Sequence, residues 1–564
     1  GAFYGEGVTR RLLFARAELV AESIESRGIQ STWHSLVATH ASRVAASAAA
    51  VSRALPSLTA ILDDLPLRDA AFADDLLDGL TMSEIGVLYE FSLAHVDRGS
   101  RKSSGQFFTP DDVAQFLAAR VARFPAGVWI DPCCGVGNLS YWLAREQPDP
   151  DRFVATSLVL VDRDPLALLI ACVLLTVEFE RERPIYLAVA GHSRVADALT
   201  DELPEYDYAI LNPPYVVVPR DDRFASAESR DLYAYFIERM LRAGDRERRG
   251  IVAICPQSFT TGVKFTTFRQ LLVRRLTTMD IYCFDNVPDN VFRGFKFGSH
   301  NTNRVNSTRA AVLVGTARVS GDGDGEQPVP NRHRITPLLR WRSHERAELF
   351  ERADDFLSPL QPDAERAFPK VGADLVPLHQ EMVAVEATLA DITSREWTPF
   401  HLDVPMTPRY FLSAVKRSLD RGHVHRLYFP TSATRDRAYV VLNSSLAYWW
   451  WRVYEGGITV SKSTLASLPL PIASARRSLV VEIEKSEHEN VVVKQNAGRR
   501  NENVKHHWRL LRELNRVVAP EYVEQLMAVH QNSNVAIYRE ANSSSSELRS
   551  VISTPADAPI SRSS

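Results

Sequence analysis

The segment Asn212-Pro213-Pro214-Tyr215 gives the clearest indication of a chemical function in the sequence. It directly follows the apolar run Tyr208–Leu211. Proline fixes φ and lacks an N–H group. The two prolines therefore make a rigid turn that can point the Asn212 side-chain oxygen and the Pro213 carbonyl outward as acceptors. Two acceptors on the hydrogens of a ring-bound amine return electron density to its nitrogen and favour the tetrahedral geometry needed for attack. The segment predicts a cradle for an exocyclic amine with Tyr215 stacked on the ring, although an isolated Asn-Pro-Pro-Tyr is also compatible with an ordinary turn.

A second group of residues predicts a ligand site built on acidic side chains and a glycine turn. The run from Asp131 to Leu139 contains Gly135 and Gly137 and follows the apolar stretch that ends at Ile130. Such a turn after the first strand of an α/β sheet lets the backbone approach a nucleotide-like ligand. It lacks the third glycine of the dinucleotide pattern, and an aspartate before it suits a zwitterionic or cationic ligand better than a pyrophosphate. Two more aspartates follow later strand-like segments, and each one alone is equally compatible with a helix cap: Asp162 and Asp197.

The elements that must position these residues read as alternating strands and helices. Short apolar runs separated by helix-like segments predict a doubly wound, Rossmann-like α/β sheet. Thr109-Pro110 supplies an N-cap and a proline at the first helical position, so we expect a helix to begin at Pro110. The five expected strands cover residues 128–130, 158–161, 208–211, 250–254 and 310–314.

The segments that flank this sheet have different compositions. The N-terminal part is rich in Ala and Leu at helical spacing, a Gly/Asp/Pro stretch at 320–331 ends the strand–helix alternation, and the Ser-rich end from Asn542 onward is expected to be disordered. We therefore predict a helical region (1–104), a catalytic domain (105–320), a mixed α+β domain (331–477) and a helical, charged tail with a disordered end (478–564).

Composition narrows the class of protein. At 564 residues with 45% hydrophobic and 24% charged residues, the chain matches a multidomain globular protein rather than a fibrous or disordered one. No apolar run reaches the length of a membrane span, and the N-terminal residues do not resemble a secretory signal, so we expect an intracellular protein. The five cysteines have no C-x-x-C pair, which argues against a zinc site or a disulfide framework. The net charge is −3, but residues 401–477 hold 11 Lys/Arg against 4 Asp/Glu.

The order and spacing of several blocks resemble the amino-methyltransferases that act on adenine N6 of DNA, in the gamma arrangement and of the restriction-modification type with their own C-terminal target-recognition domain. The match covers residues 105–320 well and the stretch Asn443–Pro471 more loosely. The Cys133-Cys134 pair in the turn and the polar run 299–303 depart from the family pattern. The blocks that carry the resemblance are Gly105–Pro110, Asp131–Gly137, Asp162, Asp197, Asn212–Tyr215, Asp231–Phe236 and Cys255–Phe259.

The resemblance implies S-adenosylmethionine as the cofactor and assigns roles residue by residue. Asn212, Pro213, Pro214 and Tyr215 would be catalytic, and Phe292 would join Tyr215 against the flipped base. The cofactor would be bound by Phe107, Thr109, Pro110, Asp131, Cys133, Gly135, Gly137, Asp162 and Asp197. Phe292 is equally compatible with a core position, and the Tyr448–Trp451 cluster reads as core.

The resemblance also implies duplex DNA as the partner and a methyl transfer that needs no metal, and the lack of a long apolar run predicts no association with a membrane. We expect a monomer in the cytoplasm of a bacterium, associated with the nucleoid. Residues 1–104 show no nuclease motif, so we predict no DNA cleavage by this chain, and any cognate restriction endonuclease would be a separate protein. The basic region would contact phosphates. Its candidate residues are Arg409, Lys416, Arg417, Arg421, Arg426, Arg435, Arg437 and Lys462.

Two other functions remain compatible with the sequence. Methyltransferases of protein glutamine side chains, or of exocyclic amines in ribosomal RNA, use the same amine cradle. The chain is also compatible with a DNA-binding specificity or defence subunit in which turnover is incidental. The Phe-Phe-Thr-Pro block and the basic C-terminal region favour DNA, and the intact Asn212–Tyr215 segment favours an enzyme.

Overall fold

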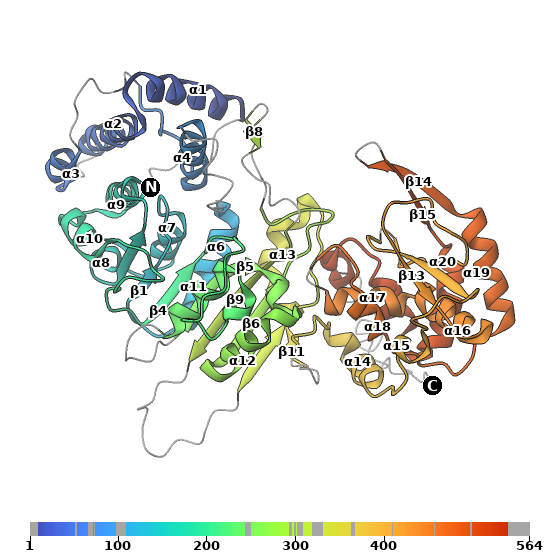
Figure 1. Cartoon of the computed structure of the whole chain (residues 1–564). Helices are drawn as coiled ribbons and strands as arrows, with labels where there is room; N and C mark the ends of the chain where they lie inside the picture. Colours follow the sequence, from blue (N-terminus) through green and yellow to red (C-terminus); the bar gives the residue numbers. More distant parts are fainter. Residues whose placement is uncertain are drawn as a thin grey trace, which may run out of the picture. The chain divides into compact units, whose positions relative to one another are not determined.

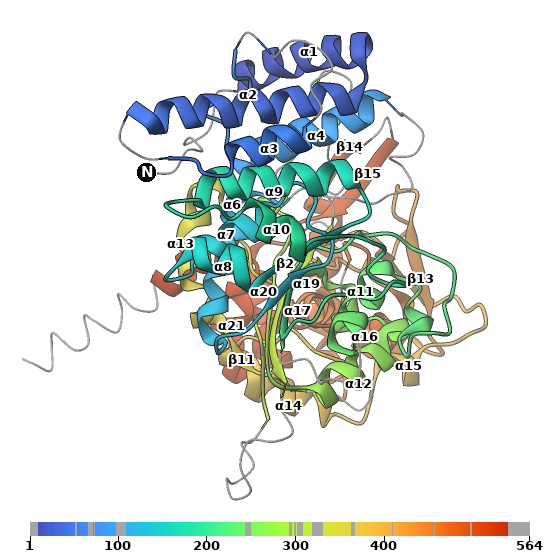
Figure 2. The same ribbon diagram turned by 90° about the vertical axis from the view of Figure 1, so that its left-hand side faces the viewer.

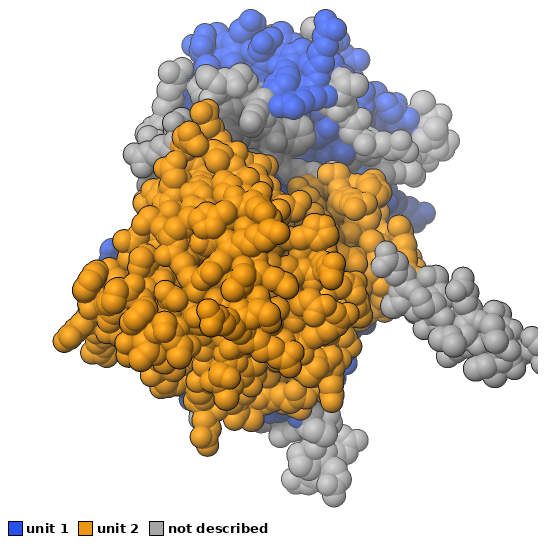
Figure 3. All heavy atoms as spheres, turned by 90° about the vertical axis from the view of Figure 1, so that its right-hand side faces the viewer, with its two compact units in different colours: residues 1–286, 290–337, 357–371 blue, residues 287–289, 338–356, 372–564 orange. Residues whose placement is uncertain are grey.

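The architecture is taken from a computed structural model of the chain (Figure 1). The structure describes residues 10–50, 54–65, 72, 74–96, 109–242, 250–292, 296–297, 300–301, 308–317, 331–361, 367–408, 410–455, 457–496 and 499–539. These residues divide into two compact units, which Figure 3 shows in different colours. Unit 1 comprises residues 1–286, 290–337 and 357–371, and unit 2 comprises residues 287–289, 338–356 and 372–564.

Unit 1 begins with four helices, as the Ala- and Leu-rich pattern predicts. They are α1 (Arg10–Arg27), α2 (Ile29–Ala50), α3 (Leu58–Asp64) and α4 (Met82–Val96). Helix α2 packs along α9 (Pro165–Phe179) (Figure 2). The fully buried Glu180 carboxylate accepts hydrogen bonds from the backbone N–H and the hydroxyl of Ser57, which ties the N-terminal helices to the sheet domain. A buried carboxylate needs such donors because an unpaired charge in the interior is costly.

A nine-stranded sheet forms the centre of unit 1, with the order β11-β10-β6-β9-β5-β4-β1-β2-β3. Strands β1, β2, β3, β4 and β5 are parallel, whereas β9 is antiparallel to both of its neighbours, β5 and β6. The predicted doubly wound α/β sheet is confirmed, and each of the five expected strands is present. The strands are β1 (Trp129–Asp131), β2 (Leu158–Asp162), β3 (Arg194–Val195), β4 (Tyr208–Leu211), β5 (Gly250–Pro256), β6 (Leu276–Cys283), β9 (Ala310–Ala317), β10 (Arg332–Ile335) and β11 (Ser358–Pro359).

Helices lie on both sides of this sheet (Figure 1). Helix α11 packs against β5 and α12 against β6, while α7 contacts β4 and α9 contacts β2. A short β-hairpin, β7 (Lys296–Phe297) with β8 (His300–Asn301), adds to the unit. The helices not yet bounded are α6 (Asp111–Ala119), α7 (Asn138–Arg145), α8 (Pro150–Thr156), α10 (Tyr186–His192), α11 (Leu232–Arg242) and α12 (Thr266–Arg275). Helix α6 begins one residue after the predicted start, with Pro110 at its N-cap.

The edge strand β11 and its neighbour β10 come from residues that the sequence assigns to the C-terminal domain. Strand β10 has the sequence Arg-His-Arg-Ile, which lacks an apolar alternation, and it pairs with β6. Its Arg334 guanidinium binds both oxygens of the buried Asp280 carboxylate on β6, at 2.8 and 2.7 Å. The pairing is thus supported by a charge contact that hydrophobic periodicity does not reveal.

Unit 2 is mixed α+β, as predicted for the C-terminal region. Strand β12 (His401–Pro405) pairs with β13 (Val424–Tyr428), and β14 (Val491–Asn496) pairs with β15 (Arg499–Val504). Helix α17 (Ser445–Tyr454) is buried along almost its whole length, which confirms the core reading of Tyr448–Trp451. The other helices are α13 (Arg346–Arg352), α14 (Val376–Val383), α15 (Leu389–Ile392), α16 (Ser432–Asn443), α18 (Lys462–Ala466), α19 (Arg477–Glu489), α20 (Trp508–Val518) and α21 (Val523–Ala528).

The β14–β15 hairpin corrects the prediction of an all-helical segment after residue 477. Helix α19 ends at Glu489, and three consecutive valines, 491–493, begin the hairpin. β-Branched side chains lose rotamer freedom in a helix and fit a strand, so this run outweighs the helical tendency of the charged residues around it. The Ser-rich stretch from Asn542 lies outside the described residues. Within the described part of the chain, no helix has both the length and the apolarity to cross a membrane.

Candidate functional site

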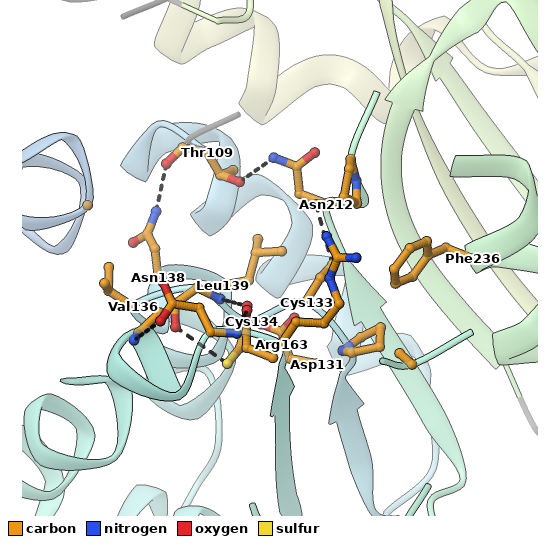
Figure 4. A pocket seen from close by; sticks show the side chains of 18 of the residues that line it. Thr109, Asp131, Cys133, Cys134, Val136, Asn138, Leu139, Arg163, Asn212 and Phe236 are labelled. Carbon is orange, nitrogen blue, oxygen red and sulfur yellow. Dashed lines mark hydrogen bonds between the residues drawn. The ribbon is translucent and has the colours of Figure 1, made fainter. Parts of the chain in front are cut away.

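A cavity opens at the carboxyl edge of the sheet, where β1, β2, β3 and β4 end (Figure 4). These strands are parallel, so the side chains that follow them meet at one edge. Asp131, Asp162, Asp197 and Asn212, each at or just after the end of a different strand, all line the cavity. Among the described lining residues there are five carboxylates and one arginine: Glu90, Asp131, Asp162, Asp164 and Asp197, against Arg163.

The glycine turn after β1 forms the floor of this cavity and is held by Asp162. Gly135 and Gly137 have φ values of 53° and 92°, in the left-handed region that glycine adopts without strain. The Gly135 N–H donates to Asp162 Oδ2 at 2.8 Å, and the Asp164 N–H donates to Asp162 Oδ1 at 2.9 Å. Burial raises the pKa of the Asp162 carboxyl. Gly137 is not a lining residue; it caps α7, where a Cβ would lie 3.1 Å from the Cβ of Ala171 on α9.

Asp131 is a buried acid facing a ligand cavity. It is 1% exposed, and Ser140 Oγ donates to its Oδ2 at 3.0 Å, while Oδ1 has no hydrogen-bond partner among the described residues. Burial raises the pKa of Asp131 to about 7, and the charge of Asp162 adds to this effect. A cationic ligand group would stabilise the ionised carboxylate, so the site is suited to an ammonium or sulfonium rather than to a phosphate.

The Asn212 side chain is held at the cavity by Thr109. Its Nδ2 donates to Thr109 Oγ1 at 2.9 Å, and Asn138 Nδ2 donates to the Thr109 carbonyl at 2.7 Å (Figure 4). The Cys133 thiol donates weakly to the Asn212 backbone carbonyl at 3.5 Å. Burial and the nearby carboxylates raise the pKa of Cys133 well above its usual value, so it remains a thiol. The Asn212 turn and the turn after β1 are therefore directly connected.

The two aromatic residues proposed to face a base lie together. The rings of Tyr215 and Phe292 meet edge to face, with centroids 5.9 Å apart and planes at 69°. The Tyr215 hydroxyl donates to the Ile254 carbonyl at 3.2 Å, and burial raises the pKa of this phenol. Phe292 is fully buried and Tyr215 is half-buried, and neither of them is among the residues that line the cavity. In this geometry Phe292 supports the Tyr215 ring.

Helix α4 supplies a wall of the cavity that the sequence did not predict. Gly86, Tyr89, Glu90 and Leu93 line it from this helix. The Tyr89 hydroxyl donates to Asp164 Oδ2 at 2.6 Å, and burial together with the Asp164 charge raises the pKa of Tyr89. The sequence predicts a helical region over 1–104 but carries no signal that one of its helices lines a cavity. Phe236 of α11 also lines the cavity.

Arg163 is a further lining residue that the sequence reasoning missed. It follows Asp162 directly, and its guanidinium lies 3.8 Å from the Asp197 carboxylate. Asp197 Oδ1 also accepts from the Leu199 N–H at 3.0 Å, so this aspartate both lines the cavity and stabilises its own loop.

The remaining predicted site residues do not all line the cavity. Phe107 and Arg409 lie outside the described residues. Pro214 lines the cavity, whereas Pro110 and Pro213 are not among its lining residues. Among the described residues, no group of three or more His, Cys, Asp or Glu side chains is arranged to hold a metal ion.

Most of the basic residues predicted to contact DNA are engaged within unit 2. Arg426 binds the buried Asp403 carboxylate through two hydrogen bonds, at 2.7 and 2.9 Å. Lys416 pairs with Asp436 and Glu484, and Arg417 pairs with Glu502. The others donate to neighbouring groups: Arg421 to Asn503, Arg435 to Asp436, and Arg437 to the carbonyls of Leu470 and Ile472. Lys462 is the first residue of α18 and stays a candidate for phosphate contact.

Comparison with known proteins identifies the sheet domain. Residues 81–299 match the family model described as N-6 DNA Methylase. This segment is therefore similar to N-6 DNA methylase domains. The match begins inside the N-terminal helical region and includes α4, so the helix that walls the cavity belongs to the methylase domain. The search of curated proteins found no match.

Several solved structures resemble the chain at low sequence identity. They are the DrdV–DNA complex (13% identity, TM-score 0.40, 63% of this chain and 44% of that one), a type I restriction-modification methyltransferase subunit from Streptococcus thermophilus (14%, 0.31, 53% and 62%) and the type IIG restriction endonuclease BpuSI (12%, 0.39, 92% and 78%). The chain thus spans less than two thirds of the DrdV chain and of the Streptococcus thermophilus subunit.

Proposed function

We propose that this chain is a site-specific DNA methyltransferase that transfers a methyl group from S-adenosylmethionine to the exocyclic N6 of adenine in duplex DNA. The observation that carries the proposal is the position of Asn212. Its amide lies at the edge of an acid-lined cavity, directly after the central strand β4, in a methylase domain. An acceptor at that place is suited to an amine brought next to a cationic methyl donor.

The donor atoms of the cavity fit S-adenosylmethionine. This cofactor carries an ammonium and a sulfonium and supplies the activated methyl group. Five carboxylates against one arginine suit a cation, and the buried Asp131 Oδ1 offers an acceptor for the ammonium. Asp162 would meet the ribose hydroxyls beside the Gly135 turn, and Asp197 would accept from the adenine amino group. Phe107, Pro110, Cys133 and Gly137 complete the proposed cofactor-binding set, with Gly137 shaping the turn.

The target adenine must leave the helix to reach this site, which costs a few kcal/mol of stacking and pairing. Tyr215 would stack on the extruded base and recover part of that cost, while Pro214 lines the cavity beside it. The Asn212 oxygen and the Pro213 carbonyl would each accept a hydrogen of N6, which directs the nitrogen lone pair toward the methyl donor. An amide does not take up a proton at neutral pH, so the proton lost from N6 would pass to solvent.

Cofactor affinity is expected to rise with pH because of Asp131. Below its pKa of about 7, this carboxyl is protonated and cannot pair with an ammonium. The raised pKa also means that the ligand-free fold loses stability as pH rises from the normal aspartate range through about 7, and a bound cation offsets this loss. Between pH 5 and 7, affinity should increase about tenfold per unit. Isothermal titration calorimetry with the wild type and Asp131→Asn measures this. A pH-independent wild-type affinity, or an unchanged slope in the variant, would exclude Asp131 from the site.

The proposed reaction is tested by incubating the purified chain with plasmid DNA and isotopically labelled cofactor, followed by mass spectrometry of the nucleosides. Label in N6-methyladenine is the expected result. Label only in ribosomal RNA or in protein glutamine would instead support one of the related amine methyltransferases, and tight duplex binding without label would support a specificity subunit. We also infer that the chain acts as a monomer and that any restriction activity resides elsewhere. Magnesium-dependent cleavage of the same plasmid would contradict the second inference.

A further inference from the structure

We infer that Thr109 is a positioning residue for the catalytic amide: its hydroxyl holds the Asn212 side chain with the oxygen toward the target amine. The inference rests on the proposed function, and it gives Thr109 a role other than the cofactor contact implied by family resemblance. Thr109 is 5% exposed and lies two residues before α6, far from Asn212 in the sequence. The hydrogen bond from Asn212 Nδ2 to Thr109 Oγ1, at 2.9 Å, joins these two segments.

Thr109 is itself held in place. Its backbone carbonyl accepts from Asn138 Nδ2 at 2.7 Å, and Asn138 is 4% exposed at the first position of α7. Asp111, two residues further on, accepts from Trp142 Nε1 at 3.1 Å, which ties the start of α6 to α7 a second time. The hydroxyl that meets Asn212 therefore projects from a backbone fixed by a neighbouring helix.

The chemistry of an amide makes this contact consequential. An asparagine side chain presents an acceptor at one end and a two-hydrogen donor at the other, and rotation by 180° exchanges them. Only the acceptor end can bind the hydrogens of an amine, because the donor end would meet them with like partial charges. In the structure the Thr109 oxygen accepts from Nδ2, so the donor end of the amide is turned toward Thr109 and the acceptor end is turned away from it. Proline at 213 fixes the backbone and not the rotation of the Asn212 side chain, so the Thr109 contact bears directly on the orientation of the amide.

Replacement by valine tests the role, because valine keeps the shape of threonine and removes the acceptor. For Thr109→Val we expect kcat for methyl transfer to fall about 10- to 100-fold, while cofactor affinity measured by calorimetry stays within about twofold. Thr109→Ser restores the hydroxyl and should return kcat to within about threefold of the wild type. The matched control is Thr176→Val, a fully buried threonine whose hydroxyl donates to the Cys172 carbonyl inside α9; its kcat should be unchanged.

The measurement separates this inference from the proposed function. The wild type is assayed first, and its acceptor establishes whether DNA adenine is the substrate. If label appears in RNA or protein instead, the proposed function fails, and the same kcat ratio is measured on that acceptor. The positioning role is overturned if Thr109→Val keeps wild-type kcat, if serine does not rescue it, or if cofactor affinity falls in parallel with kcat. A parallel fall of affinity and kcat would instead indicate that Thr109 contacts the cofactor, as the family resemblance implies. Absence of transfer to any amine would overturn both proposals.

Discussion

The Asn212→Ala variant is expected to lose methyl transfer by at least about 1000-fold while its cofactor affinity stays within a few-fold of the wild type. The side chain provides an acceptor for the amine in the transition state, and none of its described hydrogen bonds involves the acids of the cavity. Single-turnover assays with saturating DNA and cofactor measure the first quantity, and calorimetry measures the second. An unchanged melting temperature shows that the variant is folded.

The opposite pattern would change the interpretation of Asn212. A drop in cofactor affinity of ~100-fold, about 2.7 kcal/mol, would mean that this side chain builds the cofactor site. Retention of transfer would mean that the Pro213 carbonyl alone holds the amine.

The Asp162→Ala variant is expected to show the reverse effect, a loss of cofactor affinity of ~100-fold or more. Removal of the carboxylate leaves the N–H groups of Gly135 and Asp164 without their acceptor and releases the turn that forms the floor of the cavity. It also removes the proposed acceptor for the ribose hydroxyls. Calorimetric titration with S-adenosylmethionine and with its demethylated product provides the measurement.

Asp149→Ala is the matched control for this variant. Asp149 also accepts from a backbone N–H, that of Arg152 at the start of α8, but it does not line the cavity. Its loss should cost about 1 kcal/mol of stability, as for other N-caps, with no effect on cofactor affinity. Equal effects of the two substitutions on affinity would show that Asp162 acts only through general stability.

The strands that position the site could be predicted from the sequence because they are continuous apolar runs. Parallel strands buried on both faces need such runs, and β2 and β4 are buried at every position. Their order along the chain then places Asp131, Asp162 and Asn212 at one edge. Strand β10 could not be predicted in this way, since its arginines enter the sheet only because Asp280 of β6 receives Arg334.

Two features could not be predicted because they depend on tertiary contacts: the position of α4 at the cavity and the ion pairs of the basic residues in unit 2. Tyr89 faces Asp164 because a helix from the N-terminal region packs beside α7, and no local pattern records that contact. The excess of basic residues counted over 401–477 likewise does not show that some of these arginines pair with acids outside that range, as Arg417 does with Glu502. Both contacts join residues that are far apart in the sequence, so a local pattern cannot reveal them.

The alternation of the polypeptide between the two units constrains how unit 2 could be exchanged for a different domain. Residues 331–337 and 357–371 belong to unit 1, whereas 338–356 and everything from 372 onward belong to unit 2. If all residues from 331 onward were replaced, the nine-stranded sheet of unit 1 would lose β10 and β11. If only the residues from 372 onward were replaced, Glu348 would remain but its partner Arg539 would be lost. Replacement of unit 2 by a foreign domain would therefore require two separate blocks of sequence to be exchanged together.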